Sequence, residues 1–307
     1  MNFMIKIRVI LFFSVFVLLC SCGQSGHEGN NDSGKDSLKT ANADSVFNIA
    51  VLPTLDCLPF YIACENKLFA DKGVDVRLTV YKSQMDSDTA IISGYAQAAI
   101  SDIVRAEHMK MNGCDVDYWS IGGSVWSLVV NKNLSIDKLN KLNEKMLSMA
   151  RYSATHYLAD TISKIARLDD MQLFQIQIND IGIRYRMLMN NQMDALLLPE
   201  PYATSARMKG HAVLFDSKKI DMPMGALIVS AANDKLRNKQ IADILEVYNS
   251  VCKSIDENGI KSYNGIISKY CGVEELADSI PADIKYGQAV KPQVKDVERI
   301  VSWLNKQ

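Results

Sequence analysis

Residues 47–73 constrain the fold more than any other stretch, because they contain a strand, a loop and a helix in immediate succession. Residues 47–52 form a short apolar run with β-branched members that ends before a proline, which is typical of a buried strand. From Pro59 onward, apolar residues recur at helical spacing until Gly73, which favours a helix end. In an open α/β sheet, ligands lie outside the carboxyl ends of the strands. The loop at 53–58 is therefore the first place where we expect a ligand, although an ordinary connection has the same pattern.

Strand and helix patterns continue to alternate after this unit. Strands are expected at 74–81, 96–101, 117–121 and 125–130. Helices are expected at 89–93 and 103–111. The first of these helices would begin at an N-cap formed by Asp86 or Ser87 and end at Gly94. This alternation predicts a mostly parallel sheet in an α/β fold.

A second α/β unit follows the first. Its expected strands and helix lie at 146–150, 156–168 and 174–178, and a helix, turn and strand follow at 186–198. Asn191 stands at the turn, where asparagine accepts a left-handed conformation. We expect the chain to enter this unit near Lys132 and to leave it near Met222, because a strand pattern at 226–229 precedes helices only. Lobe 1 would then comprise 46–131 and 223–307, and lobe 2 would comprise 132–222, with a double-strand hinge between them.

Several phrases resemble the type 2 periplasmic binding proteins, in the branch that binds alkylsulfonates, taurine, nitrate and thiamine pyrimidine precursors. They are Pro59-Phe60-Tyr61-Ile62-Ala63, Lys67-Leu68-Phe69 and Gly73-Val74-Asp75-Val76. Lys67 replaces the usual glycine of the family. A helix-to-strand phrase occurs twice, with Gln97 where the family has aspartate and with that aspartate present at Asp194. The resemblance covers nearly the whole chain after residue 45 and weakens after Lys235.

The resemblance implies a two-lobed type 2 periplasmic-binding-protein fold with a mixed sheet in each lobe. It also implies a monomer that captures a small molecule between the lobes and delivers it to an ABC permease in the inner membrane. A sensor that closes in the same way, and a biosynthetic enzyme on the same scaffold, are the alternatives. Neither is distinguished by the residues that carry the resemblance.

The amino terminus predicts export. Residues 9–19 form an apolar run that follows two basic residues and is too short for the ~20 residues that span a bilayer, so 1–21 is expected to be a signal peptide. The junction Leu19-Cys20-Ser21-Cys22 resembles a bacterial lipobox, with Cys22 as the lipid-bearing residue. A plain secretory signal is the alternative. Residues 22–45 are polar and rich in Gly, Ser and Asn, which predicts a flexible tether. We therefore expect the protein in the cell envelope, lipid-anchored to a membrane and facing the periplasm.

Composition and motif content exclude several function classes. With 34 basic and 35 acidic residues among 307, the chain has no charge excess that would attract nucleic acid. The four histidines are scattered, and no metal, phosphate, dinucleotide or nucleophile motif occurs, so neither a cofactor, a metal nor catalysis is expected. Five cysteines follow Cys22 without C-x-x-C spacing, and their pairing cannot be assigned. They are Cys57, Cys64, Cys114, Cys252 and Cys271.

Candidate ligand-binding residues lie at the expected strand ends and at the starts of the helices that follow. They are Thr54, Asp56, Cys57, Phe60, Tyr61, Gln84, Asp86, Asp102, Ser153, Thr155, His156, Glu200 and Tyr202. Several of them occupy positions that are also typical of a helix N-cap or of a core residue, and those interpretations stay open. Among nearby bases only Lys82 and Arg151 lie beside these loops. The carboxylates therefore favour a neutral or cationic nitrogen heterocycle, such as a thiamine pyrimidine precursor, over a sulfonate or nitrate.

Overall fold

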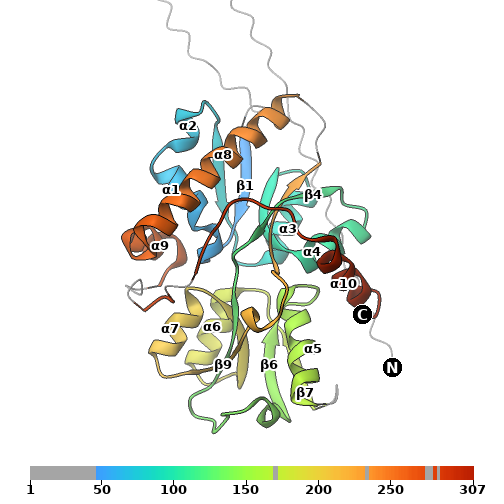
Figure 1. The fold of residues 1–307 in the computed structure, drawn as a ribbon. Coiled ribbons are helices and arrows are strands. Elements are labelled where there is room, and N and C mark those ends of the chain that lie inside the picture. The colour runs from blue at the N-terminus through green and yellow to red at the C-terminus, as the bar shows by residue number, and fades with distance from the viewer. Residues whose placement is uncertain (1–45, 169–171, 232–234, 274–278, 282–283) are drawn as a thin grey trace, which may run out of the picture. The chain divides into compact units, whose positions relative to one another are not determined.

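The structure is a computed structural model that describes residues 46–168, 172–231, 235–273, 279–281 and 284–307. The expected signal peptide, tether and Cys22 lie outside the described residues. Within them, the strands form two five-stranded sheets (Figure 1). The orders are β2-β1-β3-β10-β4 and β7-β6-β8-β5-β9. We call each sheet with its helices lobe 1 and lobe 2.

Lobe 1 is built on the sheet that starts with the opening unit. Its strands are β1 (Phe47–Val51), β2 (Val76–Val80), β3 (Ala98–Asp102), β4 (Val116–Gly122) and β10 (Gly225–Ser230). β1 pairs in parallel with β2 and β3, whereas β10 runs antiparallel to β3 and β4, which makes the sheet mixed. The helices of this lobe are α1 (Leu58–Glu65), α2 (Leu68–Asp71), α3 (Gln84–Ile92), α4 (Ile103–Met111), α8 (Lys235–Asn258), α9 (Asn264–Cys271) and α10 (Val294–Leu304), with 3₁₀ turns η2 (Leu55–Cys57) and η5 (Ile260–Tyr263).

Lobe 2 repeats this plan. Its strands are β5 (Trp126–Val130), β6 (Lys145–Met149), β7 (Leu173–Gln177), β8 (Ala195–Pro199) and β9 (Ala212–Asp216). Its helices are α5 (Ala154–Ala166), α6 (Ile181–Met189) and α7 (Tyr202–Met208), with 3₁₀ turns η3 (Leu139–Leu142) and η4 (Ser217–Lys219). β6 pairs in parallel with β7 and β8, and β5 runs antiparallel to β8 and β9. Both lobes are therefore mixed α/β units.

The chain passes between the two sheets twice. The first passage lies between Gly122 and Trp126, because β5 pairs with strands of lobe 2. This is earlier than the crossing expected near Lys132, because an apolar run such as 125–130 looks the same whichever sheet it joins. The return lies between Asp216 and Gly225, around the expected Met222. These two segments form the double connection between the lobes.

Two local differences from the expected helices have identifiable causes. Ser83, rather than Asp86 or Ser87, caps α3, since its Oγ accepts a hydrogen bond from the Asp86 N–H. The helix therefore begins five residues before the expected position. Lys67 has φ +57° and separates α1 from α2, and this left-handed conformation is one that glycine adopts more readily than lysine. The left-handed conformation expected at Asn191 is present, with φ +58°.

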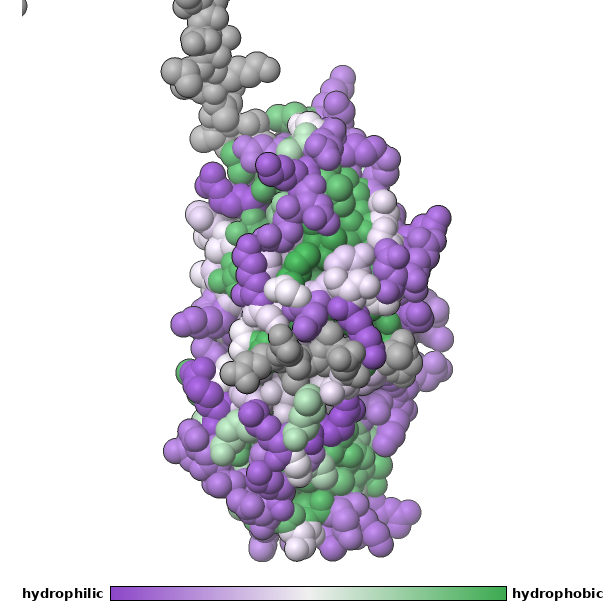
Figure 2. Space-filling view, turned by 90° about the vertical axis from the view of Figure 1, so that its left-hand side faces the viewer, coloured by the Kyte–Doolittle hydropathy of each residue, from purple (hydrophilic) through white to green (hydrophobic). Residues whose placement is uncertain are grey.

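The core follows the apolar faces of both sheets. In β1, four of five residues are buried, and Phe47 stacks on Trp119 with ring centroids 5.8 Å apart. The α5 helix buries Leu158 and Ile162 completely against lobe 2. One face of the protein carries mostly hydrophilic side chains with smaller hydrophobic areas between them (Figure 2). Burial of this extent is the main stabilising contribution to a fold of this kind.

Candidate functional site

Asp56 is the centre of the candidate site. It lies in η2, directly after β1, where a ligand is expected in an α/β fold. Thr54 Oγ1 donates a hydrogen bond to Asp56 Oδ1, and Ser124 Oγ donates to Oδ2 over 2.6 Å. Ser124 belongs to the first passage between the lobes, so Asp56 is tied directly to the hinge.

A small cavity lies beside Asp56, between the two lobes. Its volume is about 20 Å³, which is room for roughly one water molecule. Leu55 N–H of lobe 1 donates a hydrogen bond to Glu200 O of lobe 2 over 2.9 Å, and both residues line the cavity. The lining residues are Leu55, Asp56, Gly123, Ser124, Val125, Pro199, Glu200, Ile284 and Tyr286.

The cavity is acidic. Asp56 and Glu200 supply two carboxyl groups, and none of the lining residues is basic. Burial raises the pKa of Asp56 despite the hydrogen bonds from Ser124 and Thr54. Burial also raises the pKa of Glu200, and its hydrogen bond from the Thr204 N–H offsets this only in part. Both groups therefore lose solvation that a donor or a cation could replace.

A second cavity of about 100 Å³ adjoins the first. The two share Val125, Glu200 and Ile284 as lining residues. Arg207 lines this second cavity and donates from Nη2 to Ser279 O over 2.6 Å. Lys218 and Asp216 also line this second cavity, so Glu200 has a carboxylate neighbour in the first cavity and two basic residues and one acidic residue in the second.

The carboxylate at the end of β3 has a structural role. Asp102 Oδ1 accepts a hydrogen bond from the Arg105 N–H and caps α4, and Gln84 Nε2 donates to its Oδ2 over 2.8 Å. Burial raises the pKa of Asp102. Neither Asp102 nor Gln84 lines the two cavities beside Glu200. The carboxylate of Asp86 is likewise engaged, because Ser83 Oγ donates to it over 2.8 Å.

Arg105 is a base at the interlobe contact that sequence reasoning missed. It is buried in α4, forms an ion pair with Asp88, and donates from Nη1 to the Arg151 carbonyl of lobe 2 over 3.2 Å. Its immediate neighbours in α4 are apolar. Only a prediction that this face of α4 packs against Asp88 of α3 could have identified it.

The predicted residues of the α5 start form a hydrogen-bonded turn. Ser153 Oγ accepts from the Thr155 N–H and lies 2.7 Å from the Ala150 carbonyl, to which it donates. Thr155 Oγ1 accepts from the Ala150 N–H. His156 packs its ring edge to face with Trp303, and burial lowers its pKa. These residues position α5 and do not line the cavity beside Asp56.

The predicted aromatic residues contribute to the core. Phe60 and Tyr61 are fully buried, and Tyr61 stacks on Tyr270 while its hydroxyl donates to Leu52 O. Tyr202 donates to the Cys271 carbonyl over 3.1 Å. Cys57 Sγ accepts from the Leu52 N–H over 3.2 Å. Helical spacing placed these side chains near the loop but could not tell which face of the helix they occupy.

Tyr286 provides the aromatic wall that the predicted residues do not. Its hydroxyl donates to Leu55 O over 2.8 Å, and the residue lines the cavity beside Asp56. It belongs to a segment without motif or periodicity, more than two hundred residues from Asp56, so no sequence signal pointed to it.

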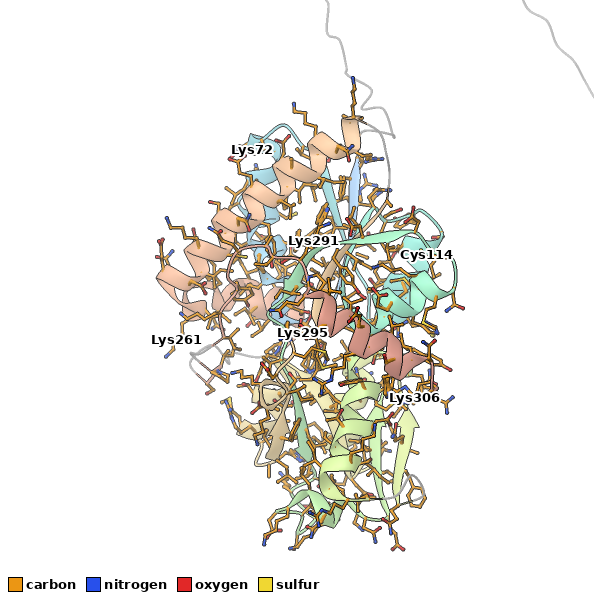
Figure 3. All side chains as sticks on the ribbon, turned by 45° about the vertical axis from the view of Figure 1, so that its right-hand side comes forward. Lys72, Cys114, Lys261, Lys291, Lys295 and Lys306 are labelled. Atoms are coloured by element: carbon orange, nitrogen blue, oxygen red, sulfur yellow. The ribbon has the colours of Figure 1, made fainter. Side chains whose placement is uncertain are left out.

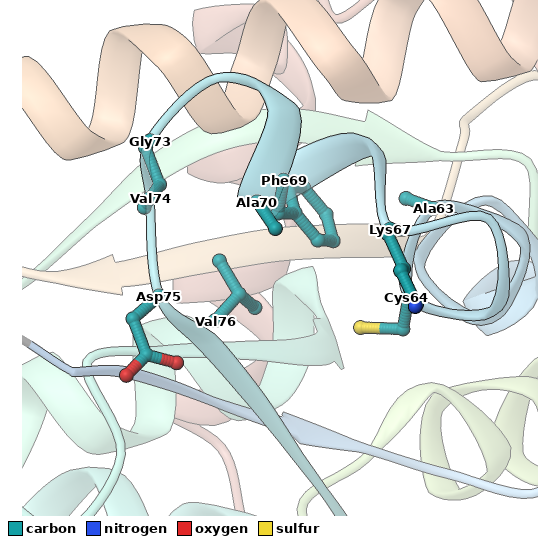
Figure 4. Close-up of a pocket in the computed structure, with 9 residues that line it drawn as sticks. All are labelled: Ala63, Cys64, Lys67, Phe69, Ala70, Gly73, Val74, Asp75 and Val76. Atoms are coloured by element: carbon teal, nitrogen blue, oxygen red, sulfur yellow. The ribbon is translucent and has the colours of Figure 1, made fainter.

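A larger cavity of about 370 Å³ lies elsewhere in lobe 1 (Figure 4). Figure 4 shows Phe69 and Cys64 among the side chains around it. Its lining residues come from α1, α2 and the beginning of β2. Because it borders the amino end of β2 and involves one lobe only, it does not correspond to the expected position of a ligand.

Metal-ligand groups, membrane-spanning helices and cysteines can be checked in the described part of the chain. There, no three side chains of the His, Cys, Asp and Glu types lie close enough together to hold a metal. Among the same residues, no helix has the length and apolar character that crossing a membrane requires. All five described cysteines have free thiols, and Cys57, Cys252 and Cys271 are buried.

Solved structures share this fold. The alkanesulfonate-binding protein SsuA from Xanthomonas axonopodis pv. citri, bound to MOPS, superposes with a TM-score of 0.74 at 11% identity, covering 85% of this chain and 92% of that one. A ligand-binding component of an ABC-type import system from Staphylococcus aureus gives 0.72 at 16% identity, with 86% and 93% coverage. The nitrate-binding protein NrtA from Synechocystis PCC 6803 gives 0.68 at 13% identity, with 82% and 74% coverage. The fold is therefore the two-lobed periplasmic-binding-protein fold.

A search of curated proteins finds no match. A model of the family described as NMT1/THI5 like matches residues 54–257, which is more than half of the chain. The matched region runs from Thr54, beside the acidic cavity, into α8. The protein belongs to the NMT1/THI5-like family.

Proposed function

We propose that this protein is a solute-binding protein, which captures a small molecule between its lobes and delivers it to the permease of an ABC importer. The observation that carries the proposal is the acidic cavity at the hinge, to which both lobes contribute side chains. Structural relatives described as sulfonate-binding, nitrate-binding and import components support it. The proposal assigns the protein no catalytic step.

Ligand binding requires the lobes to separate. A cavity of about 20 Å³ cannot hold a molecule larger than water, whereas small-molecule sites occupy roughly 300–1,000 Å³. The two passages at 123–125 and 217–224 are the connections about which such a movement would occur. A ligand can shift this equilibrium only by binding the open and closed states with different affinity. Small-angle scattering should therefore detect a change in radius of gyration at saturating ligand.

For the ligand we propose a neutral or cationic nitrogen heterocycle, with a thiamine pyrimidine precursor as the family example. Repulsion between an anion and one carboxylate about 4 Å away makes binding less favourable by ~4 kcal/mol at an effective dielectric of 20. A helix N-terminus returns only ~0.3 to 1 kcal/mol, or up to ~2 when partly buried. Asp56 and Glu200 together therefore disfavour an anion, while a protonated nitrogen would satisfy both.

An anion of the sulfonate or nitrate type is the second candidate. The alkanesulfonate-binding and nitrate-binding relatives favour it, and Arg207 lines the cavity next to Glu200. It requires the ligand to lie on the Arg207 side of Glu200, away from Asp56. The two candidates thus differ in which carboxylate matters.

A thermal-shift screen of the purified protein distinguishes them. Pyrimidines, amines, sulfonates and nitrate would be compared on the wild type, Asp56→Asn and Glu200→Gln, with exposed Asp115→Asn as the matched control. We expect stabilisation by a pyrimidine or amine that is lost in Asp56→Asn and kept in Asp115→Asn. Stabilisation by sulfonate or nitrate that survives both cavity substitutions would reverse the proposed ligand charge.

We also propose that Cys22 carries lipid and tethers the protein to a membrane at the periplasmic side. The lipobox-like junction and the polar residues 22–45 support this. Detergent partition of the wild type and Cys22→Ala tests it, with Cys20→Ala as the control for the neighbouring thiol. Partition of Cys22→Ala with membranes would show that the anchor lies elsewhere.

A further inference from the structure

The C-terminal helix α10 contacts both lobes. Its chain enters from lobe 1, where Val290 O accepts from the Ile121 N–H of β4, and the helix packs along α4. Ile300 is completely buried in this contact. Lys295 and Lys306 mark the two ends of the helix in Figure 3. On the side of lobe 1, α10 is thus anchored by the chain, by a β-type hydrogen bond and by apolar packing.

On the side of lobe 2, Trp303 makes most of the contact with α5. Arg299 Cζ also lies 6.0 Å from the centre of the Tyr157 ring, and Gln307 Nε2 donates to Asp160 Oδ2 over 3.3 Å. Trp303 Nε1 donates to Asp160 Oδ2 of α5 over 2.9 Å. Its ring meets His156 and Tyr157 edge to face, with centroid distances of 5.0 and 5.5 Å. Trp303 is only 7% exposed although it lies in the last turn of the final helix. Such ring contacts contribute more stabilising free energy than the burial of the ring surface alone would give.

A second ring contact beside it also joins the lobes. His108 of α4 stacks on Tyr152 of lobe 2, with centroids 4.3 Å apart and planes 8° from parallel. Tyr152 also meets the ring of His156, which in turn touches Trp303. The rings therefore form a continuous chain from α4 through lobe 2 to α10.

The backbone at this contact is strained. Tyr152 has φ +51°, a left-handed conformation that a tyrosine rarely adopts, and its N–H donates to His156 Nδ1 over 3.3 Å. Such a conformation persists only where the surrounding contacts hold it. Here the His156 imidazole of the same lobe and the stacked His108 ring of α4 are those contacts, and only the His108 contact crosses between the lobes.

We propose that α10 is a latch that favours the closed arrangement of the lobes before any ligand binds. The proposal rests on the lobe movement in the proposed function. Lobe 2 cannot move away from lobe 1 without breaking the Trp303 contact to α5 or pulling α10 off α4. Because the α10 contact to α4 is apolar and extensive, the Trp303 contact is the one that breaks. The latch thus lowers how often the cleft opens to admit a solute.

Hydrogen exchange of the ligand-free protein tests this directly. Two amides are bonded across the lobes away from the latch: the Leu55 N–H to Glu200 O, and the Ile181 N–H to Lys82 O. Their exchange should follow the fraction of open molecules. Trp303→Phe keeps an aromatic ring but removes the donor to Asp160. We expect about five-fold faster exchange at Leu55 and Ile181, the effect of losing one hydrogen bond.

Trp119→Phe is the matched control. Trp119 has the same 7% exposure, stacks on Phe47 within lobe 1, and has a buried Nε1 without a partner among the described residues. Its replacement should leave exchange at Leu55 and Ile181 unchanged. Asp160→Asn weakens the same bond from lobe 2, keeps the side-chain shape, and should act in the same direction as Trp303→Phe.

Two results would overturn the latch. One is unchanged exchange at Leu55 and Ile181 in both Trp303→Phe and Asp160→Asn. The other is faster exchange confined to amides of α5 and α10, which would show that Trp303 stabilises only its local surroundings. The experiment contains no ligand, so it stands apart from the thermal-shift screen: either proposal can fail while the other holds.

Discussion

Replacing Asp56 by Asn should stabilise the ligand-free protein. The carboxylate accepts hydrogen bonds from Thr54 and Ser124, and no described basic side chain lines its cavity. Each hydrogen bond to a charged group is worth about 1.5–3 kcal/mol, against about 0.5–1.5 for a neutral one. The substitution therefore loses about 2–3 kcal/mol from the two bonds. Asn can keep both contacts, because hydroxyl groups donate or accept.

The gain comes from removing a desolvated charge. The effective penalty for burying one ion is several kcal/mol, and burial raises the pKa of Asp56 in spite of its hydrogen bonds, so the penalty is the larger quantity. We expect a net increase of about 2 kcal/mol in the free energy of unfolding at pH 7, or about 4–8 °C in melting temperature.

Urea denaturation at two pH values provides the check. The folded-state pKa of Asp56 is raised, so its cost is present above that pKa and disappears as pH falls toward the unfolded value of 3.8. The stability advantage of Asp56→Asn should therefore shrink between pH 7 and pH 4, and exposed Asp115→Asn is measured alongside as the control. An Asp56→Asn protein that is less stable than the wild type at pH 7 would refute the desolvated-charge reasoning.

Three further substitutions have defined outcomes. Lys67→Gly should raise the free energy of unfolding by about 0.5–1 kcal/mol, because φ +57° suits glycine; a loss in thermal denaturation would contradict this. Burial raises the pKa of Asp88 from 3.8 to about 6. As pH falls from 7 to below 4, the free energy of unfolding of the wild type should therefore rise by about 3 kcal/mol relative to that of Asp88→Asn. A difference between the two proteins that stays constant with pH in urea denaturation would be inconsistent with that pKa. In Gly225→Ala the new Cβ would lie 2.6 Å from Ser124 Oγ and 3.0 Å from Gly122 O, which should cost about 1–3 kcal/mol and displace Ser124 from Asp56. Gly265→Ala, with open space around it in α9, is the control and should stabilise slightly.

The local elements of the fold could be predicted because they depend on neighbouring residues. The expected helix at 103–111 matches α4, since Asp102 caps it and the apolar spacing fills it. The predicted cap of α3 was wrong, because Ser83, Asp86 and Ser87 are all good capping residues. Only the backbone geometry selects Ser83. Lys67 concealed the break between α1 and α2 because a lysine gives no signal for a left-handed conformation.

The site depends on pairs of residues far apart in the chain. Asp56 and Glu200 were accessible to sequence reasoning, because strand ends converge in an α/β fold. Ser124 and Tyr286 could not be identified in this way. Ser124 reaches Asp56 because of the course of the first passage between the lobes, and Tyr286 reaches Leu55 from a segment without periodicity. Phe60 and Tyr61 were placed in the site by proximity along the chain, but helix rotation directs both into the core.

The contact between Tyr286 and Leu55 has a consequence for synthesis. A chain is made from its amino terminus, so β1, Asp56 and the hinge passages exist long before Tyr286 is added. Until then the cavity lacks one wall, and Leu55 O has no hydrogen-bond donor from this segment. Nascent or prematurely ended chains would thus present an incomplete pocket. Under the proposed function, the complete pocket for a solute would exist only after Tyr286 has been added.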